Sequence, residues 1–345
     1  MAGGRGSGSV TWAHMLPRVV VATNMYPSSV DPARGAFVRA QVDALRDLGV
    51  AVEVFEIVGN RRAWNYSAAI TRLRRAVKAF RPDLVYAFYG LTGWVALWQG
   101  APVVLSLAGD DVLGTPDGKG GLRFRSRVGI LVSQWAALRA AVVCVQSEEM
   151  KQRLWSERLR RRAIVMPYGV DAGRFHPGDQ RAARQHLGLP LNAPLVIFPN
   201  TPTEPRKRLD LAEAAMALVR RDIPNVEFRV VARVTHADMP EYYRAADCCL
   251  LTSDWEGSPN VVKEALLSGL PVVTTDVGDV RRWIPLSLES AIADRTPEAL
   301  AVAILRVLRE RRRVNPEPYH AQFSSQSVAE RMLELFDIAR HTGRQ

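Results

Sequence analysis

A strand–loop–helix–strand unit over residues 248–276 constrains this chain more than any other stretch. The apolar run Cys248–Ser253 predicts a buried strand, and Ser258 followed by Pro259 predicts the N-cap and first residue of a helix. Gly269 predicts the end of that helix, and the run Pro271–Asp276 predicts the next strand. Units of this kind build parallel sheets, in which ligands bind at the carboxyl ends of the strands.

Two glutamates flank the predicted helix start. Glu256 lies in the loop before the helix, and Glu264 lies about one and a half turns inside it. The free amides of Asn260, Val261 and Val262 point toward the same space, with the positive end of the helix dipole behind them. This pattern predicts a site for a phosphate whose attached groups carry hydroxyls. The alternative is a surface helix with two unrelated acids.

The stretch from Ala245 to Ile284, which contains CCLLTSDWEGSPNVVKEALLSG, resembles the signature of the family 4 retaining glycosyltransferases with the GT-B fold. Further segments are similar to that family in the same order along the chain: Pro167–Asp171, Phe175–Pro177 and Arg206–Ala212. The resemblance extends from about Val19 to Phe336 and is strongest after Ile164. It implies two Rossmann-like, doubly wound α/β domains that face each other across a cleft.

Chain length and element order agree with this fold class. A chain of 345 residues suits two domains, and apolar strand runs alternate with helical stretches, as in doubly wound parallel sheets. The helical stretches include 148–157, 207–221 and 259–268. We expect a flexible tail (1–14), an acceptor-binding domain (15–172), a nucleotide-sugar-binding domain (179–318), and a C-terminal helix (319–345) that packs back on the first domain.

The second domain is expected to be shorter than is usual in the family. Only a few residues separate the predicted strand 227–231 from the helix that begins near Met239, where the family has an additional helix and strand. The walls of a nucleotide base pocket must therefore come from elsewhere.

The resemblance assigns roles to residues of the second domain. Lys207 matches the family lysine that stabilises the leaving diphosphate. The partner arginine is normally five residues earlier, where this chain has Pro202, so Arg206 or Arg208 is the expected substitute. Glu264 is expected to hold ribose hydroxyls and Glu256 a sugar hydroxyl near the reacting carbon. Further donor contacts are expected from Ser258, Asn260 and Val261.

The first domain is expected to supply Gly35 and Asp110. Gly35 closes the loop after the first strand and would let the backbone approach the diphosphate, although a plain turn glycine is the alternative. Many family members have a histidine near this stretch and this chain has none there, so Asp110 is the expected polar group, orienting the acceptor or the donor sugar. A metal bound by Asp110 and Asp111 is the weaker alternative. The resemblance implies no metal and no cofactor, because the nucleotide sugar is a co-substrate and its leaving phosphate takes the acceptor proton.

Basic residues are concentrated in the first half of the chain. Residues 1–178 contain 24 Lys+Arg against 13 Asp+Glu, whereas the remainder contains 22 of each, so the net charge of +11 belongs to the first half. This asymmetry indicates an anionic partner. No nucleic-acid motif accompanies it, and the mixed Arg and apolar residues of 122–131 favour an anionic membrane surface. The alternatives are a buried helix with solvated arginines at 122–131 and a high use of Arg set by the base composition of the genome. The basic clusters are Arg61–Arg62, residues 72–81, residues 123–127 and residues 158–162.

The expected location is cytoplasmic, with peripheral binding to the inner membrane face. No apolar run reaches the roughly 20 residues that span a bilayer. The cysteines Cys144, Cys248 and Cys249 lie in apolar runs, which predicts buried, reduced thiols. The tail 1–14 is rich in Gly and Ser and lacks the apolar core of a signal peptide.

The sequence therefore predicts a retaining glycosyltransferase. It would move a sugar from a nucleotide-sugar donor to a glycan or lipid-linked acceptor, in the synthesis of a cell-surface polysaccharide or glycolipid. Two alternatives remain open: a nucleotide-sugar epimerase with the same fold, and a non-catalytic protein that binds nucleotide sugars.

Overall fold

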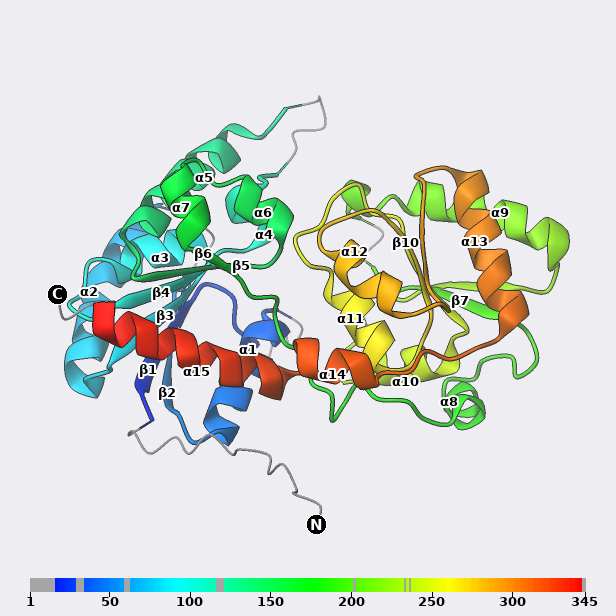
Figure 1. Ribbon diagram of the computed structural model, residues 1–345, viewed down its shortest axis with the longest axis horizontal. Coiled ribbons are helices and arrows are strands. Elements are labelled where there is room, and N and C mark those ends of the chain that lie inside the picture. The colour runs from blue at the N-terminus through cyan, green and yellow to red at the C-terminus, as the bar shows by residue number, and fades with distance from the viewer. Residues whose placement is uncertain are drawn as a thin grey trace, which may run out of the picture.

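The computed structural model shows two α/β lobes side by side, each built on one parallel sheet (Figure 1). It describes residues 16–28, 34–58, 63–115, 121–200, 203–232, 234–235 and 237–342. The predicted tail 1–14 lies outside these ranges, as do Arg61, Arg62 and Pro202. Within the described ranges, no helix combines the length and apolar character needed to cross a bilayer.

The first lobe contains a six-stranded sheet in the order β2-β1-β3-β4-β5-β6. Its central strands are apolar throughout because helices cover both faces, and residues 19–22 of β1 are fully buried. Each strand is parallel to its neighbours, with Val19 of β1 level with Val52 on one side and Leu84 on the other. The strands are β1 Arg18–Thr23, β2 Ala51–Glu56, β3 Leu84–Phe88, β4 Val103–Ser106, β5 Val142–Val145 and β6 Ala163–Val165.

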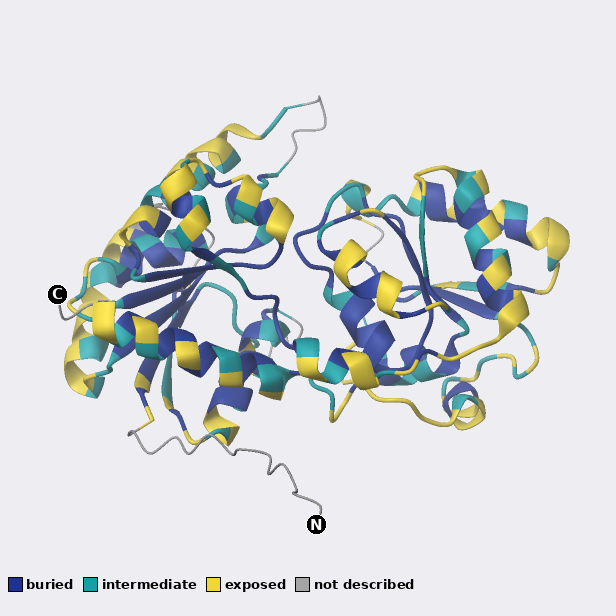
Figure 2. Cartoon of the chain, in the orientation of Figure 1, coloured by how far each residue is buried: buried dark blue, intermediate teal, exposed yellow. Residues whose placement is uncertain are grey.

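Helices cover this sheet in two layers. One face packs against α2, α3 and α5, and the other against α1 and the C-terminal helix α15 (Figure 1). Figure 2 shows the strands buried and the outer sides of the helices exposed. The helices of this lobe are α1 Ala36–Asp47, α2 Ala63–Phe80, α3 Gly90–Ala96, α4 Gly109–Val112, α5 Phe124–Arg139, α6 Glu148–Gln152 and α7 Glu157–Arg162.

The second lobe contains a five-stranded parallel sheet in the order β11-β10-β9-β7-β8. The strands are β7 Leu195–Phe198, β8 Glu227–Val230, β9 Cys248–Leu251, β10 Val272–Thr275 and β11 Ala291–Ala293. β8 forms one edge, and within the described residues α10 follows it without an intervening strand. This matches the shortened second domain that the sequence predicts.

Both faces of the second sheet are covered. α9 and α13 pack on one face, and α8, α10, α11, α12 and α14 surround the core on the other. The helices are α8 Gln180–His186, α9 Leu209–Asp222, α10 Met239–Ala245, α11 Asn260–Leu267, α12 Val280–Trp283, α13 Pro297–Glu310 and α14 Glu317–Phe323, with 3-10 turns η1 Pro205–Lys207 and η2 Ile284–Leu286. All three cysteines of the chain are buried and free, two of them in β9.

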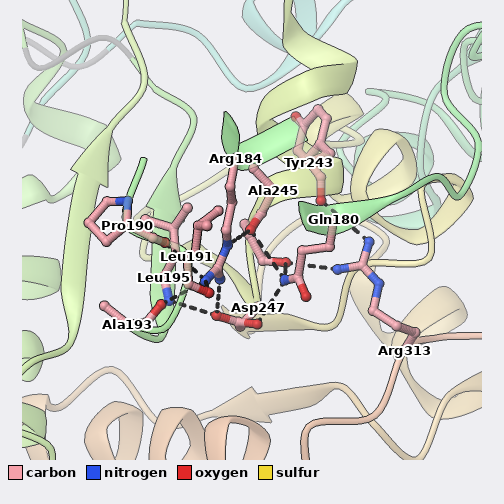
Figure 3. Close-up of polar contacts among 11 residues, drawn as sticks. Gln180, Arg184, Pro190, Leu191, Ala193, Leu195, Tyr243, Ala245, Asp247 and Arg313 are labelled. Carbon is pink, nitrogen blue, oxygen red and sulfur yellow. Dashed lines mark hydrogen bonds and ion pairs between the residues drawn. The ribbon is translucent and has the colours of Figure 1, made fainter. Parts of the chain in front are cut away.

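A buried ion pair fastens α8 to the second sheet (Figure 3). The guanidinium of Arg184 lies 2.7 Å from a carboxylate oxygen of Asp247, which also accepts a hydrogen bond from the Leu195 amide. Arg184 donates further hydrogen bonds to the carbonyl groups of Ala193 and Ala245. Removing Asp247 would leave the Arg184 guanidinium buried without a counter-charge, because the Arg184 side chain is only 6% exposed, so the pair helps to specify where α8 docks.

The final helix returns to the first lobe as predicted. α15 (Ser325–Thr342) packs along α1 on the first sheet, and the Phe336 ring lies 5.5 Å from the Tyr86 ring between centroids. At the crossing, the Val170 amide donates to the Phe323 carbonyl and the Ser325 amide donates to the Val170 carbonyl, both at 2.8 Å. The two segments that join the lobes are therefore hydrogen-bonded to each other.

Three local predictions were wrong. The helix expected at 207–221 begins at Leu209, because Arg208 adopts a left-handed conformation with φ of 54°. The helix expected at 148–157 ends at Gln152, and a separate helix, α7, begins at Glu157, where the Ser156 hydroxyl accepts a hydrogen bond from the Leu159 amide. α11 begins at Asn260 after Pro259, so Ser258 is not its N-cap. The short helices α4, α8 and α12 were not expected, and the helix expected at 319–345 is divided at Ser324 into α14 and α15.

We expect Phe336→Ala to lower the free energy of unfolding by about 3–5 kcal/mol, because it removes a fully buried ring that packs α15 against the first sheet. Ile338→Ala is the matched control on the same helix, since Ile338 is 51% exposed and its truncation should cost less than about 0.5 kcal/mol. Denaturant unfolding measures both values, and equal losses would contradict the docking of α15.

Candidate active site

A buried carboxylate at the carboxyl end of β9 holds two cations. Glu256 lies in the loop between β9 and α11, and its carboxylate accepts hydrogen bonds from Lys207 at 2.7 Å and Arg206 at 3.0 Å. The Ser253 hydroxyl donates a third, at 2.7 Å. We call Glu256, Lys207 and Arg206 the cradle. It brings together residues that are about 50 positions apart in the sequence.

The charges of the cradle keep its acid ionised. Burial would raise the pKa of Glu256, but the neighbouring charges of Lys207 and Arg206 outweigh burial and hold that pKa below its ordinary value. At neutral pH the cradle thus contains one anion and two cations. The net charge of the cradle is therefore positive, and it attracts an incoming anion.

Backbone contacts pin the cations in place. The Thr252 hydroxyl lies 2.9 Å from the carbonyl oxygens of both Lys207 and Arg208. The Asp254 amide donates to the Arg206 carbonyl at 2.8 Å. The 3-10 turn η1 is therefore attached directly to the end of β9, where the Glu256 loop begins.

Of the two candidate arginines, the structure brings only Arg206 to Glu256. The Arg206 guanidinium also stacks over the Trp255 ring at 4.8 Å and pairs with Glu204. Arg208 points to other acids, Asp210 at 2.8 Å and Asp254 at 3.1 Å. Arg208 therefore helps to form the start of α9 instead of the cradle.

Glu264 lies deeper in α11, against α10. The Tyr243 hydroxyl donates to its carboxylate at 2.8 Å, and Glu264 is only 8% exposed. Burial, followed by the charge of Glu264, raises the pKa of Tyr243 well above its ordinary value, so the tyrosine stays a donor. Glu264 is thus held in one orientation by a neutral partner, unlike Glu256, which is held by cations.

Lys263 is a buried charge that sequence reasoning missed. Its side chain is fully buried in α11, and its ammonium donates to the Tyr168 carbonyl at 2.8 Å, 95 positions earlier in the chain. Burial lowers its pKa from 10.5 to about 8, although Asp279 and Glu264 nearby favour the charged form. A lysine among the apolar residues of a buried helix was the only signal in the sequence.

The start of α11 differs from the expected arrangement. The Ser258 hydroxyl donates to Asp279 at 2.7 Å instead of capping the helix. In the first turn, the side-chain oxygen of Asn260 is buried and has no hydrogen-bond partner among the described residues. A buried acceptor without a donor is costly in free energy, so this oxygen is suited to accept a hydrogen bond from a hydroxyl group of a ligand. Val261, also in the first turn, is partly buried.

The two lobes meet beside the cradle through glycine backbones. A Cβ atom placed on Gly257 would lie 3.5 Å from the Gly109 Cα and 3.2 Å from the Met150 sulfur. One placed on Gly278, which has φ of 57°, would lie 2.7 Å from the Gly257 carbonyl oxygen. The Gly257 loop is therefore packed between the first lobe and the loop after β10, where a side chain on Gly257 would be tight and one on Gly278 would overlap the loop backbone.

The structure treats the two predicted residues of the first lobe differently. Asp110 is exposed on α4 and adjoins Gly109, so it lies next to the contact between the lobes. Its neighbour Asp111 is occupied in capping α4, since it accepts from the Ala108 amide at 2.9 Å; burial raises the pKa of Asp111 to about 7. Gly35 has φ of 67°, and a Cβ there would overlap the Met25 carbonyl, so its own turn requires glycine.

The fold and site together define a class. Two Rossmann-like lobes whose carboxyl-end loops meet beside a cluster of cations and acids are the architecture of GT-B glycosyltransferases. Residues 13–169 match the family model described as "Glycosyl transferase 4-like domain", and residues 204–310 match "Glycosyl transferases group 1". The chain belongs to the family 4 glycosyltransferases with the GT-B fold.

Individual relatives agree with this assignment. The chain is 26% identical to the putative teichuronic acid biosynthesis glycosyltransferase TuaC of Bacillus subtilis, over 84% of this chain and 88% of that one. It is 29% identical to D-inositol 3-phosphate glycosyltransferase 2 of Catenulispora acidiphila, over 79% of this chain and 70% of that one. The sucrose-phosphate synthase of Thermosynechococcus elongatus has the same fold, with a TM-score of 0.73, 17% identity, and coverage of 93% of this chain and 98% of that one.

We expect the stability of the protein to rise between pH 8 and about 10.5 because of Lys263. Its pKa is lower in the folded state than the ordinary value of 10.5, so the unfolded chain binds more protons in this window and the burial cost disappears as pH rises. The gain is about 3 kcal/mol at most. Lys263→Met should lack this rise and Lys78→Met, an exposed control, should keep it. Parallel pH profiles of unfolding for wild type and Lys263→Met would contradict the burial of the charge.

Proposed function

We propose that the protein transfers a sugar, with retention, from a nucleotide-sugar donor to a glycan or lipid-linked acceptor in the synthesis of a cell-surface polysaccharide or glycolipid. The observation that carries this proposal is the cradle of Lys207, Arg206 and Glu256. It stands at the ends of β7 and β9, the point of the second sheet where the strand order reverses. This is where an anionic ligand of an open α/β sheet is expected to bind.

The cations of the cradle suit the leaving group. As the bond between the sugar and the diphosphate breaks, negative charge grows on the phosphate oxygens, and fixed cations stabilise that charge. Lys207 and Arg206 supply the positive charge that stabilises the leaving phosphate, together with the free amides at the start of α11. Glu256 keeps both cations positioned before the donor arrives and then accepts from a sugar hydroxyl. Glu264, held by Tyr243, accepts from the ribose.

The proposed reaction takes place on one face of the sugar. The acceptor oxygen bonds to the anomeric carbon as the bond from that carbon to the phosphate oxygen breaks, and the acceptor proton passes to the departing phosphate. No protein base is needed for this step. Lys207 and Arg206 provide the positive charge, so the proposal includes neither a metal nor a cofactor. Asp110, next to the contact between the lobes, would orient the acceptor or the donor sugar.

Related proteins support the choice of donor and acceptor. The name of the TuaC relative places that protein in teichuronic acid biosynthesis. A structure of Anabaena HepE, which shares this fold with a TM-score of 0.67 at 16% identity and covers 93% of this chain and 99% of that one, contains UDP and glucose. We extend a nucleotide-sugar donor and a polysaccharide acceptor from these proteins to this chain.

A donor panel tests the function. The protein is incubated with UDP-, GDP- and ADP-sugars, with and without glycan and lipid-linked acceptors, and free nucleoside diphosphate and the anomeric configuration of the product are measured. A retaining transferase releases nucleoside diphosphate only with acceptor and keeps the configuration of the donor. An epimerase would return an altered donor instead, and a binding protein would do neither.

Replacing Lys207 tests whether the cradle contributes to turnover. We expect Lys207→Met to lower turnover by about 10²–10³, the loss typical of removing one group that stabilises developing charge. Lys78→Met, on the exposed side of α2, should leave turnover unchanged. Unchanged turnover in Lys207→Met would remove the cradle from the mechanism.

We further propose that α5 binds the anionic membrane that carries the acceptor. Four of its apolar side chains are exposed, and they lie within an arc of about 80° on one side of the helix. They are Phe124, Val128, Leu131 and Leu138, at 79%, 43%, 52% and 44% exposure. Arginines flank this stripe, so apolar groups can enter the headgroup region while guanidinium groups meet lipid phosphates. Figure 2 shows α5 along the outer edge of the first lobe.

Vesicle sedimentation tests this surface. We expect binding to vesicles that contain phosphatidylglycerol, weakening as salt increases, and no binding to neutral phosphatidylcholine. The double variant Arg125→Ser/Arg127→Ser should lose about 30-fold in affinity, at about 1 kcal/mol per basic residue. The same replacement of Arg309 and Arg311 in the second lobe is the control. Absent or salt-insensitive binding of the wild-type protein would reject the proposal.

A further inference from the structure

A hollow of about 1010 Å³ lies between the lobes, beside the two segments that join them, of which residues 171–174 are called the hinge. One side of α1 forms part of its wall, and the hinge residues 171–174 and the junction of α14 with α15 form another part. The second lobe contributes Thr235 and Ala237, from the short connection between β8 and α10. The cradle residues do not line this hollow.

Glu264 lies between two segments that lead into the hollow. On one side, the neighbouring Lys263 holds the Tyr168 carbonyl at 2.8 Å, and the chain reaches the wall of the hollow three residues later at Asp171. On the other side, Tyr243 of α10 donates to Glu264, and the same helix begins two residues after Ala237. Both segments therefore connect the surroundings of Glu264 to the wall of the hollow.

The order of the strands in the second sheet also relates the cradle to this hollow. The cradle lies over the ends of β7 and β9, and β8 is the neighbour of β7 on the other side. The connection that leaves the end of β8 carries Thr235 and Ala237. β8 is the edge strand, and the described residues of the second lobe form no further strand that could close a pocket there. The facing wall is α1 of the first lobe.

We propose that the nucleoside end of the donor occupies this hollow, with its base held between α1 and the lining residues Thr235 and Ala237. The inference rests on the function proposed above and adds where the nucleotide is recognised. The volume is ample, since pockets for small ligands measure about 300–1,000 Å³. The lobe expected to bind the acceptor would then also select the base, and selection would require both lobes.

Polar groups suited to a base edge stand on α1. The Arg39 guanidinium and the Asp43 carboxylate lie 3.5 Å apart, and their side chains are 60% and 50% exposed. Together they offer donors and an acceptor side by side, which the edge of a base can match with its own carbonyl and N–H groups. Ala40, next to Arg39, lines the hollow without filling it.

Titration calorimetry with UDP, GDP, ADP and inorganic pyrophosphate tests this inference. Pyrophosphate reaches the cradle but has no nucleoside to place in the hollow. Ala40→Trp fills the space and Arg39→Ala removes a donor, and each should weaken the preferred nucleoside diphosphate by about tenfold or more. Both should leave the affinity for pyrophosphate unchanged. Ala68→Trp, on the exposed side of α2, is the matched control for a bulky substitution on a helix.

The possible outcomes are distinguishable. Selective loss of nucleoside diphosphate affinity in both variants, with wild-type melting temperatures, supports the inference. Wild-type affinity in both variants overturns it, and so does an equal loss for pyrophosphate, which would locate the effect at the cradle. Lys207→Met should weaken both kinds of ligand. If the wild-type protein binds no nucleoside diphosphate at all, the proposed function itself fails.

Discussion

A buried anion between two cations is the interaction on which the second lobe's site depends. Glu256 is 8% exposed, and without it Lys207 would lose its carboxylate partner, whereas Arg206 would keep its pair with the more exposed Glu204. The acid and the cations therefore depend on one another. This requirement explains the supporting contacts: Thr252 pins η1 to the end of β9, and Trp255 covers the Arg206 guanidinium. These contacts attach the loop at several points, where its charges meet their partners.

The paired state also indicates what a ligand must do. A diphosphate entering the cradle replaces part of the contact between Glu256 and its cations, so it gains attraction without having to create a new cationic site. Fixed charges of this kind need little reorganisation when charge develops on the ligand. The cost of gathering them is already met by folding.

The sequence predicted those features that depend on local rules. Apolar runs separated by turn residues predicted both parallel sheets, and Gly269 correctly marked the end of α11, where φ is 70°. Features determined by distant partners were not predictable. Ser258 bonds Asp279, 21 residues later, and so does not cap α11. α8 is held by Arg184 and Asp247, which are 63 residues apart, and its own seven residues carry a weak pattern.

The candidate site shows the same division. The resemblance located Lys207 and Glu256, but only the three-dimensional arrangement shows that Arg206 reaches Glu256 whereas Arg208 pairs with Asp210 and Asp254. Lys263 escaped notice because its partner, the Tyr168 carbonyl, is a backbone atom far away in sequence. Residue identity alone does not indicate which backbone group a side chain will meet.

The chain passes between the lobes twice, and the two passages are joined at Val170 by hydrogen bonds to Phe323 and Ser325. Two fastened straps restrict relative motion more than one would. They permit bending about the line that connects them, but they oppose twisting of one lobe against the other. This double connection therefore holds the two lobes in one relative alignment at the glycine backbones of Gly109 and Gly257.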